Sequence, residues 1–195
     1  MRFPLDLRFK LFVVAPQTSV VDAAGELLLH VKQKAFKLKE SVTVFRDTAQ
    51  TRPLYKIAAD RILDISANYR IDDEGGMPLG TLRRQGMRSM WRAHYEIHRG
   101  GVPVFTIREE NPWVKVLDGL LGEIPILGLF TGYVLHPAYR MCRVRTDTPV
   151  LRAVKQPAFF ESRYVIESSE PLAPEEQTLA VLALLMMLLL ERGRG

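Results

Sequence analysis

The longest uninterrupted apolar run of the chain, Leu179–Leu190, lies almost at the C-terminus. Pro174 and two glutamates precede this run, and Arg192 and Gly193 follow it, as is typical of the start and the end of a helix. A helix over 174–191 would have no polar face and must therefore be buried all round. Its apolar part would be roughly 18 Å long, whereas a bilayer core needs about 30 Å. We therefore predict a core helix that the rest of the chain encloses.

Most of the remaining chain alternates between apolar and polar residues, which indicates short strands. In one strand Trp91, Ala93, Tyr95 and Ile97 alternate with polar residues. Turn sequences at 22–25 and 72–76 predict hairpins, because Asp and Gly favour tight turns. The predicted strands cover 7–15, 19–22, 26–34, 41–45, 53–57, 62–71, 79–85, 90–98, 102–108, 140–145, 150–155 and 162–168.

A second helix is predicted near 112–121. Asn111 is a candidate N-cap and Pro112 suits the first helical position, with apolar residues following at helical spacing until Gly122. The apolar, Gly-rich stretch 125–135 that comes next resembles a membrane segment, but Asp118, Glu123 and several glycines argue against one.

An internal repeat relates 20–57 to 70–107. Pro53-Leu-Tyr-Lys-Ile57 matches Pro103-Val-Phe-Thr-Ile107, and the turn at Asp22 matches the one at Asp72. Val154-Lys-Gln-Pro-Ala-Phe159 forms a partial third copy of the stretch that begins at Val31. Repeated meanders of short strands favour a sheet closed on itself, which leaves no edge strands and can hide an apolar helix.

Composition places the chain among ordinary globular proteins and selects no partner. The 195 residues, 47% hydrophobic and 25% charged, suit one domain over 1–195. A net charge of +5 and a pI near 9.5 allow nucleic acid, an anionic membrane or an acidic ligand. The single cysteine, Cys142, excludes an internal disulfide framework and is typical of a reducing cytoplasm. Asp6 interrupts the apolar run that a secretion signal would need.

The short strands, the Asp-x-x-Gly hairpins, the Val31-Lys-Gln-Lys34 stretch and the final apolar helix together resemble the LURP-one-related family. This family is similar to the Tubby C-terminal domain and the phospholipid scramblases. The resemblance covers Leu7 to Leu190 and implies a closed antiparallel barrel of about twelve strands around a central C-terminal helix. It implies no enzymatic activity and no cofactor. Tubby domains bind phosphoinositide head groups, but no Tubby lipid-site motif, scramblase calcium loop or cysteine cluster has a match here.

Two basic stretches form the candidate binding site. Arginine and lysine grip phosphate groups, and corresponding positions of the two repeat units would form one exterior patch if the units lay side by side. The alternative is that these charges only keep the outer faces of strands from aggregating. The candidate residues are Lys32, Lys34, Lys37, Lys39, Arg83, Arg84 and Arg88.

Other candidate sites have weaker support. His94, Glu96 and His98 share one strand face, but no further metal ligand is evident, so we expect no metal site. Cys142 has neighbouring arginines that could lower its pKa, but no histidine at a spacing that suggests a catalytic pair. Nucleotide-binding, hydrolase and metalloprotease motifs are absent from the sequence, so we expect no enzyme.

We therefore expect a non-catalytic cytoplasmic barrel, peripheral at a membrane, that binds phosphoinositide or anionic lipid through the basic patch. The alternative is a protein-interaction or structural module without a lipid ligand. A ligand inside the barrel is disfavoured because the helix should fill that space. Nucleic acid is not an expected partner, since alternation turns Trp91 and Tyr95 inward, away from stacking.

Overall fold

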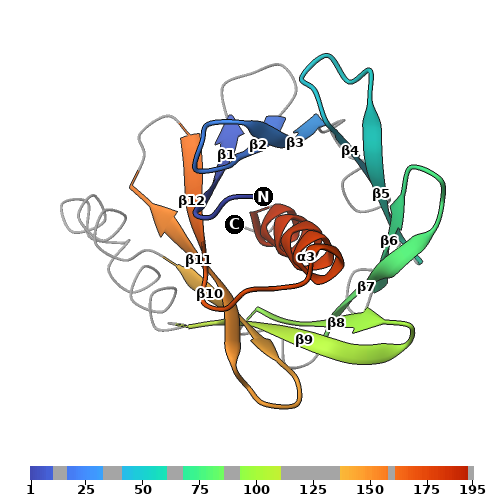
Figure 1. Ribbon diagram of the computed structural model, residues 1–195, viewed down its shortest axis with the longest axis vertical. Coiled ribbons are helices and arrows are strands. Elements are labelled where there is room, and N and C mark those ends of the chain that lie inside the picture. The colour runs from blue at the N-terminus through green and yellow to red at the C-terminus, as the bar shows by residue number, and fades with distance from the viewer. Residues whose placement is uncertain are drawn as a thin grey trace, which may run out of the picture.

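A computed structural model describes residues 1–10, 17–32, 41–60, 68–85, 93–110, 137–157 and 161–192. Within these ranges twelve antiparallel strands close into a barrel around one helix, α3, as Figure 1 shows in a view down the barrel. The strands are β1 (Leu5–Lys10), β2 (Gln17–Val21), β3 (Leu27–Lys32), β4 (Ser41–Phe45), β5 (Pro53–Ala59), β6 (Asn68–Asp73), β7 (Pro78–Arg84), β8 (His94–Arg99), β9 (Val102–Glu109), β10 (Ala138–Arg143), β11 (Pro149–Gln156) and β12 (Glu161–Ser168). The predicted fold class is confirmed. The helix predicted near 112–121 lies outside the described residues.

The wall follows chain order. Each strand pairs with its sequence neighbours, and β12 pairs with β1 to close the sheet, with Leu7 opposite Tyr164. Strand alternation turns one side chain in two toward the axis; Leu5, Leu7 and Phe9 of β1 are fully buried, while Arg8 and Lys10 are exposed. Closure leaves no unpaired edge that could recruit another chain.

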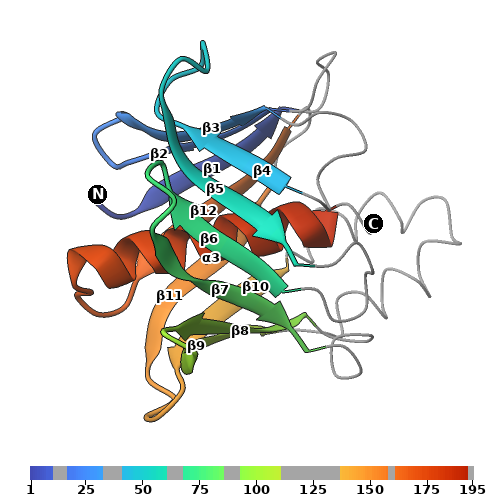
Figure 2. The same ribbon diagram turned by 90° about the vertical axis from the view of Figure 1, so that its right-hand side faces the viewer.

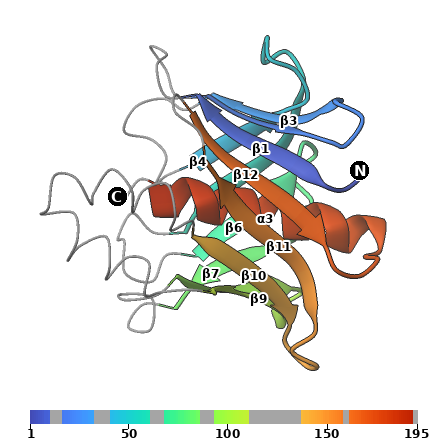
Figure 3. The same cartoon turned by 90° about the vertical axis from the view of Figure 1, so that its left-hand side faces the viewer.

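The helix α3 (Pro174–Arg192) runs along the barrel axis, as the side views in Figures 2 and 3 show. It begins at Pro174, with Glu175 and Glu176 in its first turn and Arg192 in its last, which complements the helix dipole. Every residue from Leu179 to Leu189 is buried. The predicted core helix over 174–191 is therefore confirmed to within one residue.

The wall and the helix meet closely at Gly80 of β7. A Cβ atom built on this glycine would lie 2.6 Å from the carbonyl oxygen of His98 and 2.8 Å from Cδ1 of Leu179. Both distances are far below van der Waals contact. The absence of a side chain at this position therefore lets the helix approach β7.

The two ends of the barrel differ. We call "turn end" the end with the described connections β2–β3, β4–β5, β6–β7, β8–β9 and β10–β11 and the start of α3. The "exit end" is the opposite one, where α3 finishes. Alternate strands of an antiparallel barrel run in the same direction, so β3, β7 and β11 all finish at the exit end.

Two turns at the turn end share one hydrogen-bond pattern. The Asp22 carboxylate accepts from the backbone N–H groups of Ala24 and Glu26, and the Asp73 carboxylate accepts from that of Met77. Gly25 and Gly76 take the left-handed conformation, with φ of 81° and 82°. Asp22 therefore corresponds to Asp73. The sequence match of Asp22 with Asp72 is wrong by one residue. Both hairpins have a β-bulge at the same place, between Val20 and Val21 and between Ile71 and Asp72, so Val21 corresponds to Asp72.

Candidate functional site

The structure separates the described members of the two basic stretches instead of placing them side by side. Lys32 ends β3, whereas Arg83 lies near the end of β7, and β4, β5 and β6 stand between these strands. Four steps of roughly 4.8 Å put the two positions about 19 Å apart along the wall. They nevertheless share the exit end, because β3 and β7 run in the same direction.

Arg83 and Arg84 face opposite sides of the wall. Arg83 is exposed, beside Glu96 of β8 and Asn68 of β6 in the strand register. Arg84 is only 7% exposed, on the same face as the buried Leu82. The exterior position predicted for Arg84 is therefore wrong, because adjacent residues of a strand cannot both face outward. Lys34, Lys37, Lys39 and Arg88 lie outside the described residues.

Charge is distributed unevenly along the barrel axis. At the turn end, acidic side chains outnumber basic ones in the hairpin turns and in the first turn of α3. Among the described residues away from the turn end, by contrast, basic side chains outnumber acidic ones. The turn-end acids are Asp22, Glu26, Asp47, Asp73, Glu74, Asp147, Glu170, Glu175 and Glu176; the turn-end arginines are Arg2, Arg46, Arg52, Arg99, Arg143 and Arg145.

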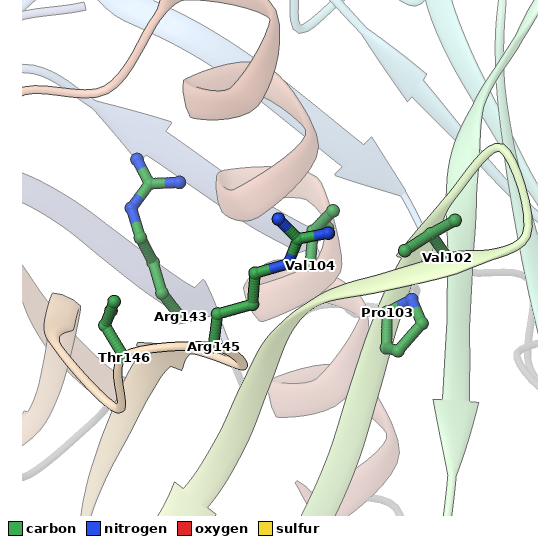
Figure 4. A pocket seen from close by; sticks show the side chains of 6 residues that line it. All are labelled: Val102, Pro103, Val104, Arg143, Arg145 and Thr146. Carbon is green, nitrogen blue, oxygen red and sulfur yellow. The ribbon is translucent and has the colours of Figure 1, made fainter.

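A shallow hollow of about 250 Å³ opens at the turn end (Figure 4). Val102, Pro103, Val104, Arg143, Arg145 and Thr146 line it. The Arg143 guanidinium lies 2.6 Å from a Glu170 oxygen and 3.1 Å from a Glu176 oxygen, and hydrogen bonds to Glu176 and Glu170 raise its pKa. Arg143 thus ties the wall to the start of α3 instead of serving a ligand. Because two carboxylates already neutralise the Arg143 guanidinium, this hollow is a poor site for an anion.

The exit end carries polar side chains inside the barrel. The Tyr95 hydroxyl donates a hydrogen bond of 2.7 Å to the Glu191 carboxylate, and the Arg192 guanidinium lies 4.9 Å from the centroid of the Phe9 ring. Burial raises the pKa of Tyr95, and burial, with carboxylates nearby, raises that of Tyr164 to about 12. These tyrosines are therefore neutral hydrogen-bonding groups at physiological pH. The cluster holds the end of α3 in position.

Arginines on the outer wall share carboxylates. Arg8 and Arg163 stand directly opposite each other on β1 and β12, and both contact Asp6, at 2.6 and 2.9 Å. Burial opposes ionisation of Asp6, but the hydrogen bonds from Arg8 and Arg163 outweigh it, so the pKa of Asp6 is lowered. Arginine pairs of this kind could not be predicted from the sequence, because only cross-strand register brings the two arginines together.

The described residues support neither a metal centre nor a reactive thiol. Within the described ranges no three His, Cys, Asp or Glu side chains are grouped as metal ligands, and His98 contacts Glu96 at 3.2 Å instead. Cys142 is 8% exposed, and burial raises the pKa of its thiol. The predicted lowering of that pKa by arginines is wrong because desolvation outweighs their charge. None of the described helices has the length and apolarity that crossing a membrane requires.

The chain is similar to one solved structure and to one family of sequences. A solved structure of an Arabidopsis thaliana protein is similar to this chain, with 14% identity, a TM-score of 0.49, and coverage of 94% of this chain and 90% of that one. No curated protein matches. The family model described as LURP-one-related matches residues 27–188, which is most of the barrel together with nearly all of the central helix. The chain therefore belongs to the LURP-one-related family.

Proposed function

We propose that this LURP-one-related barrel is a non-catalytic, Tubby-like module that binds an anionic phospholipid surface with its exit end. The observation that carries the proposal is the charge asymmetry along the barrel axis, with acids concentrated at the turn end of a chain whose net charge is +5. A molecule with this polarity is drawn to an anionic surface with its basic end first.

A surface suits the geometry better than a single head group. Lys32 and Arg83 are about 19 Å apart along the wall, from four strand steps of roughly 4.8 Å, so one head group cannot engage both. A flat layer of anionic lipids can, because both positions belong to the same end of the barrel. In sequence, Lys34, Lys37 and Lys39 follow Lys32, and Arg88 follows Arg83. The strands that precede these residues in sequence, β3 and β7, both finish at this end.

The test is co-sedimentation of the full chain with vesicles of phosphatidylcholine alone or with added phosphatidylserine. We expect binding only to the anionic vesicles, weakened by raising the salt concentration. Reversal of Lys32, Lys34 and Arg83 to Glu should weaken binding at least about 100-fold, since each cation near the surface contributes about 1 kcal/mol. Arg84 is left intact, because a glutamate at this buried position would destabilise the barrel.

The matched control reverses three exposed arginines of the turn end, Arg2, Arg46 and Arg52, to Glu. This variant has the same net charge as the first, so a general charge effect would weaken both equally. Equal weakening of binding in the two triple variants would contradict the proposal. So would binding of the unmodified chain to neutral vesicles as strong as its binding to anionic ones. Loss of lipid binding together with a stable protein partner on purification would instead support the interaction-module alternative.

A further inference from the structure

Three arginines stand side by side on the outer face of β9, β10 and β11. Arg140 is directly opposite Arg108 on one side and Arg152 on the other. Their side chains are 55%, 52% and 43% exposed for Arg108, Arg140 and Arg152, respectively. Directly opposed residues of antiparallel strands have Cα atoms about 4.5–5.5 Å apart, and like charges at this spacing repel each other. The row therefore needs counter-charge.

The carboxylates near the row neutralise it unevenly. Glu110 receives hydrogen bonds from Arg152, at 3.0 Å from Nε and 2.9 Å from Nη2, and lies 3.3 Å from Nε of Arg140. One carboxylate thus serves two arginines. Among the described residues, Arg108 forms an ion pair with Asp147. The distance from Nη1 of Arg108 to Oδ1 of Asp147 is 3.8 Å, which is too long for a hydrogen bond. Asp147 is itself 72% exposed, so solvent screens this contact.

A hollow of about 180 Å³ opens beside Arg108 and Arg140. Arg108, Glu109, Glu110, Arg140, Cys142 and Asp147 line it. Glu109 is buried on the inward face beside Tyr139, so its charge belongs to the barrel interior. Cys142 is a neutral thiol, because burial raises its pKa. Glu110 already holds Arg152 and Arg140, whereas the Asp147 carboxylate makes only the 3.8 Å contact with Arg108 among the described residues.

We propose that this hollow binds a phosphate group, free or as a small phosphate monoester, between Arg108 and Arg140. A tetrahedral dianion offers oxygens to both planar guanidinium groups at once, which a single carboxylate held at 3.8 Å does not. The bound phosphate displaces the Asp147 carboxylate, which acts as an internal competitor. The site is on the outer wall and does not depend on the lipid surface proposed for the exit end.

The experiment is a titration of the isotopically labelled full chain with inorganic phosphate and, separately, with glycerol 3-phosphate, followed by NMR at constant ionic strength set with sodium chloride. We expect saturable shifts of the backbone signals near Arg108 and Arg140. Arg108→Gln should weaken binding about tenfold or more, because it removes charge-assisted hydrogen bonds. The matched control, Arg52→Gln, removes an exposed turn-end arginine and should leave the affinity unchanged.

Asp147→Asn separates a binding role from a structural one. Asp147 has a φ of 53°, a conformation that asparagine adopts readily, so the turn should persist. Removing the competing carboxylate should tighten phosphate binding roughly two- to fivefold, a change that corresponds to the free energy of one exposed ion pair. Tighter binding of glycerol 3-phosphate than of inorganic phosphate would indicate that the ligand is a phosphate ester. Equal binding of the two would indicate that it is free phosphate.

Three results would overturn this inference: no saturable shift with either ligand, equal weakening by Arg108→Gln and Arg52→Gln, or unchanged or weaker binding in Asp147→Asn. Failure of the lipid proposal would appear separately. Vesicle binding is tested through Lys32, Lys34 and Arg83, none of which is among the described residues that line the hollow.

Discussion

The interior and the outer wall of this barrel are stabilised by different forces. Inside, the side chains from Leu179 to Leu189 pack against inward-facing strand residues such as Phe9, Phe105 and Ile107, all of them buried. Outside, arginines of adjacent strands are held in pairs by single carboxylates, Asp6 and Glu110, and remain partly exposed. Close packing tolerates little change, whereas exposed ion pairs contribute little to stability. The interior therefore maintains the fold, and the wall is free to carry binding function.

The largest expected effect comes from removing the interior partner of the wall. A chain that ends at Ala173 lacks α3 and exposes the inward face of the strands. Each fully buried Leu or Met contributes about 1.5–3 kcal/mol, so the loss exceeds the roughly 5–15 kcal/mol that stabilises a typical domain. We expect an aggregated or molten chain without a cooperative thermal transition in circular dichroism. A soluble truncated protein with a sharp transition would show that the barrel does not need its helix.

A smaller effect is expected where the wall and the helix meet. In Gly80→Ala the new methyl group would clash with the His98 carbonyl and the Leu179 side chain, which costs about 1–3 kcal/mol. Chemical denaturation would measure this as a lower free energy of unfolding. The matched control is Gly75→Ala in the adjacent turn, where the added Cβ would meet its nearest atom at 3.4 Å and no positive φ is required. Equal stability of the two variants would mean that the helix does not press against β7.

The smallest effect concerns the wall. The pKa of Asp6 is lower in the folded protein than the usual value near 3.9, so the folded state favours the ionised carboxylate. This contribution is present above about pH 4 and is lost as the pH falls through the folded-state pKa, because the unfolded chain then binds the proton more readily. Asp6→Asn should therefore lower stability by less than about 1 kcal/mol at pH 7 and flatten the decline below pH 4. Denaturation curves at pH 7 and pH 3 would measure both changes, and an unchanged acid slope would contradict this role of Asp6.

Much of the fold could be predicted from local patterns. The apolar run after Pro174 required enclosure, and the alternation around Tyr95 required a strand with one buried face. The alternation in β7 also indicates that Arg84 faces inward, because Arg84 comes two residues after the inward-facing Leu82. The choice between Asp72 and Asp73 could not be predicted, because two adjacent aspartates fit the turn and only the hydrogen bonds show which carboxylate makes it.

The candidate sites depended far more on the arrangement of strands. A pattern within one strand states which residues share a face, but not which strand lies beside it. The separation of Lys32 from Arg83 and the meeting of Arg108 with Arg140 both follow from barrel order and register. The two residues of each pair are tens of positions apart in the sequence, so neither their separation nor their meeting could be predicted from it.

The sequence by itself determined an all-apolar helix, a set of short alternating strands and an excess of positive charge, because these depend on residue types and their spacing. Only the tertiary structure decided which charges meet. Closure of the barrel brings β1 against β12, and the register of β9, β10 and β11 aligns three arginines in one row. Coulomb interactions act over a few ångströms in space and are screened over longer distances in water, so the partners of each charge were fixed by folding.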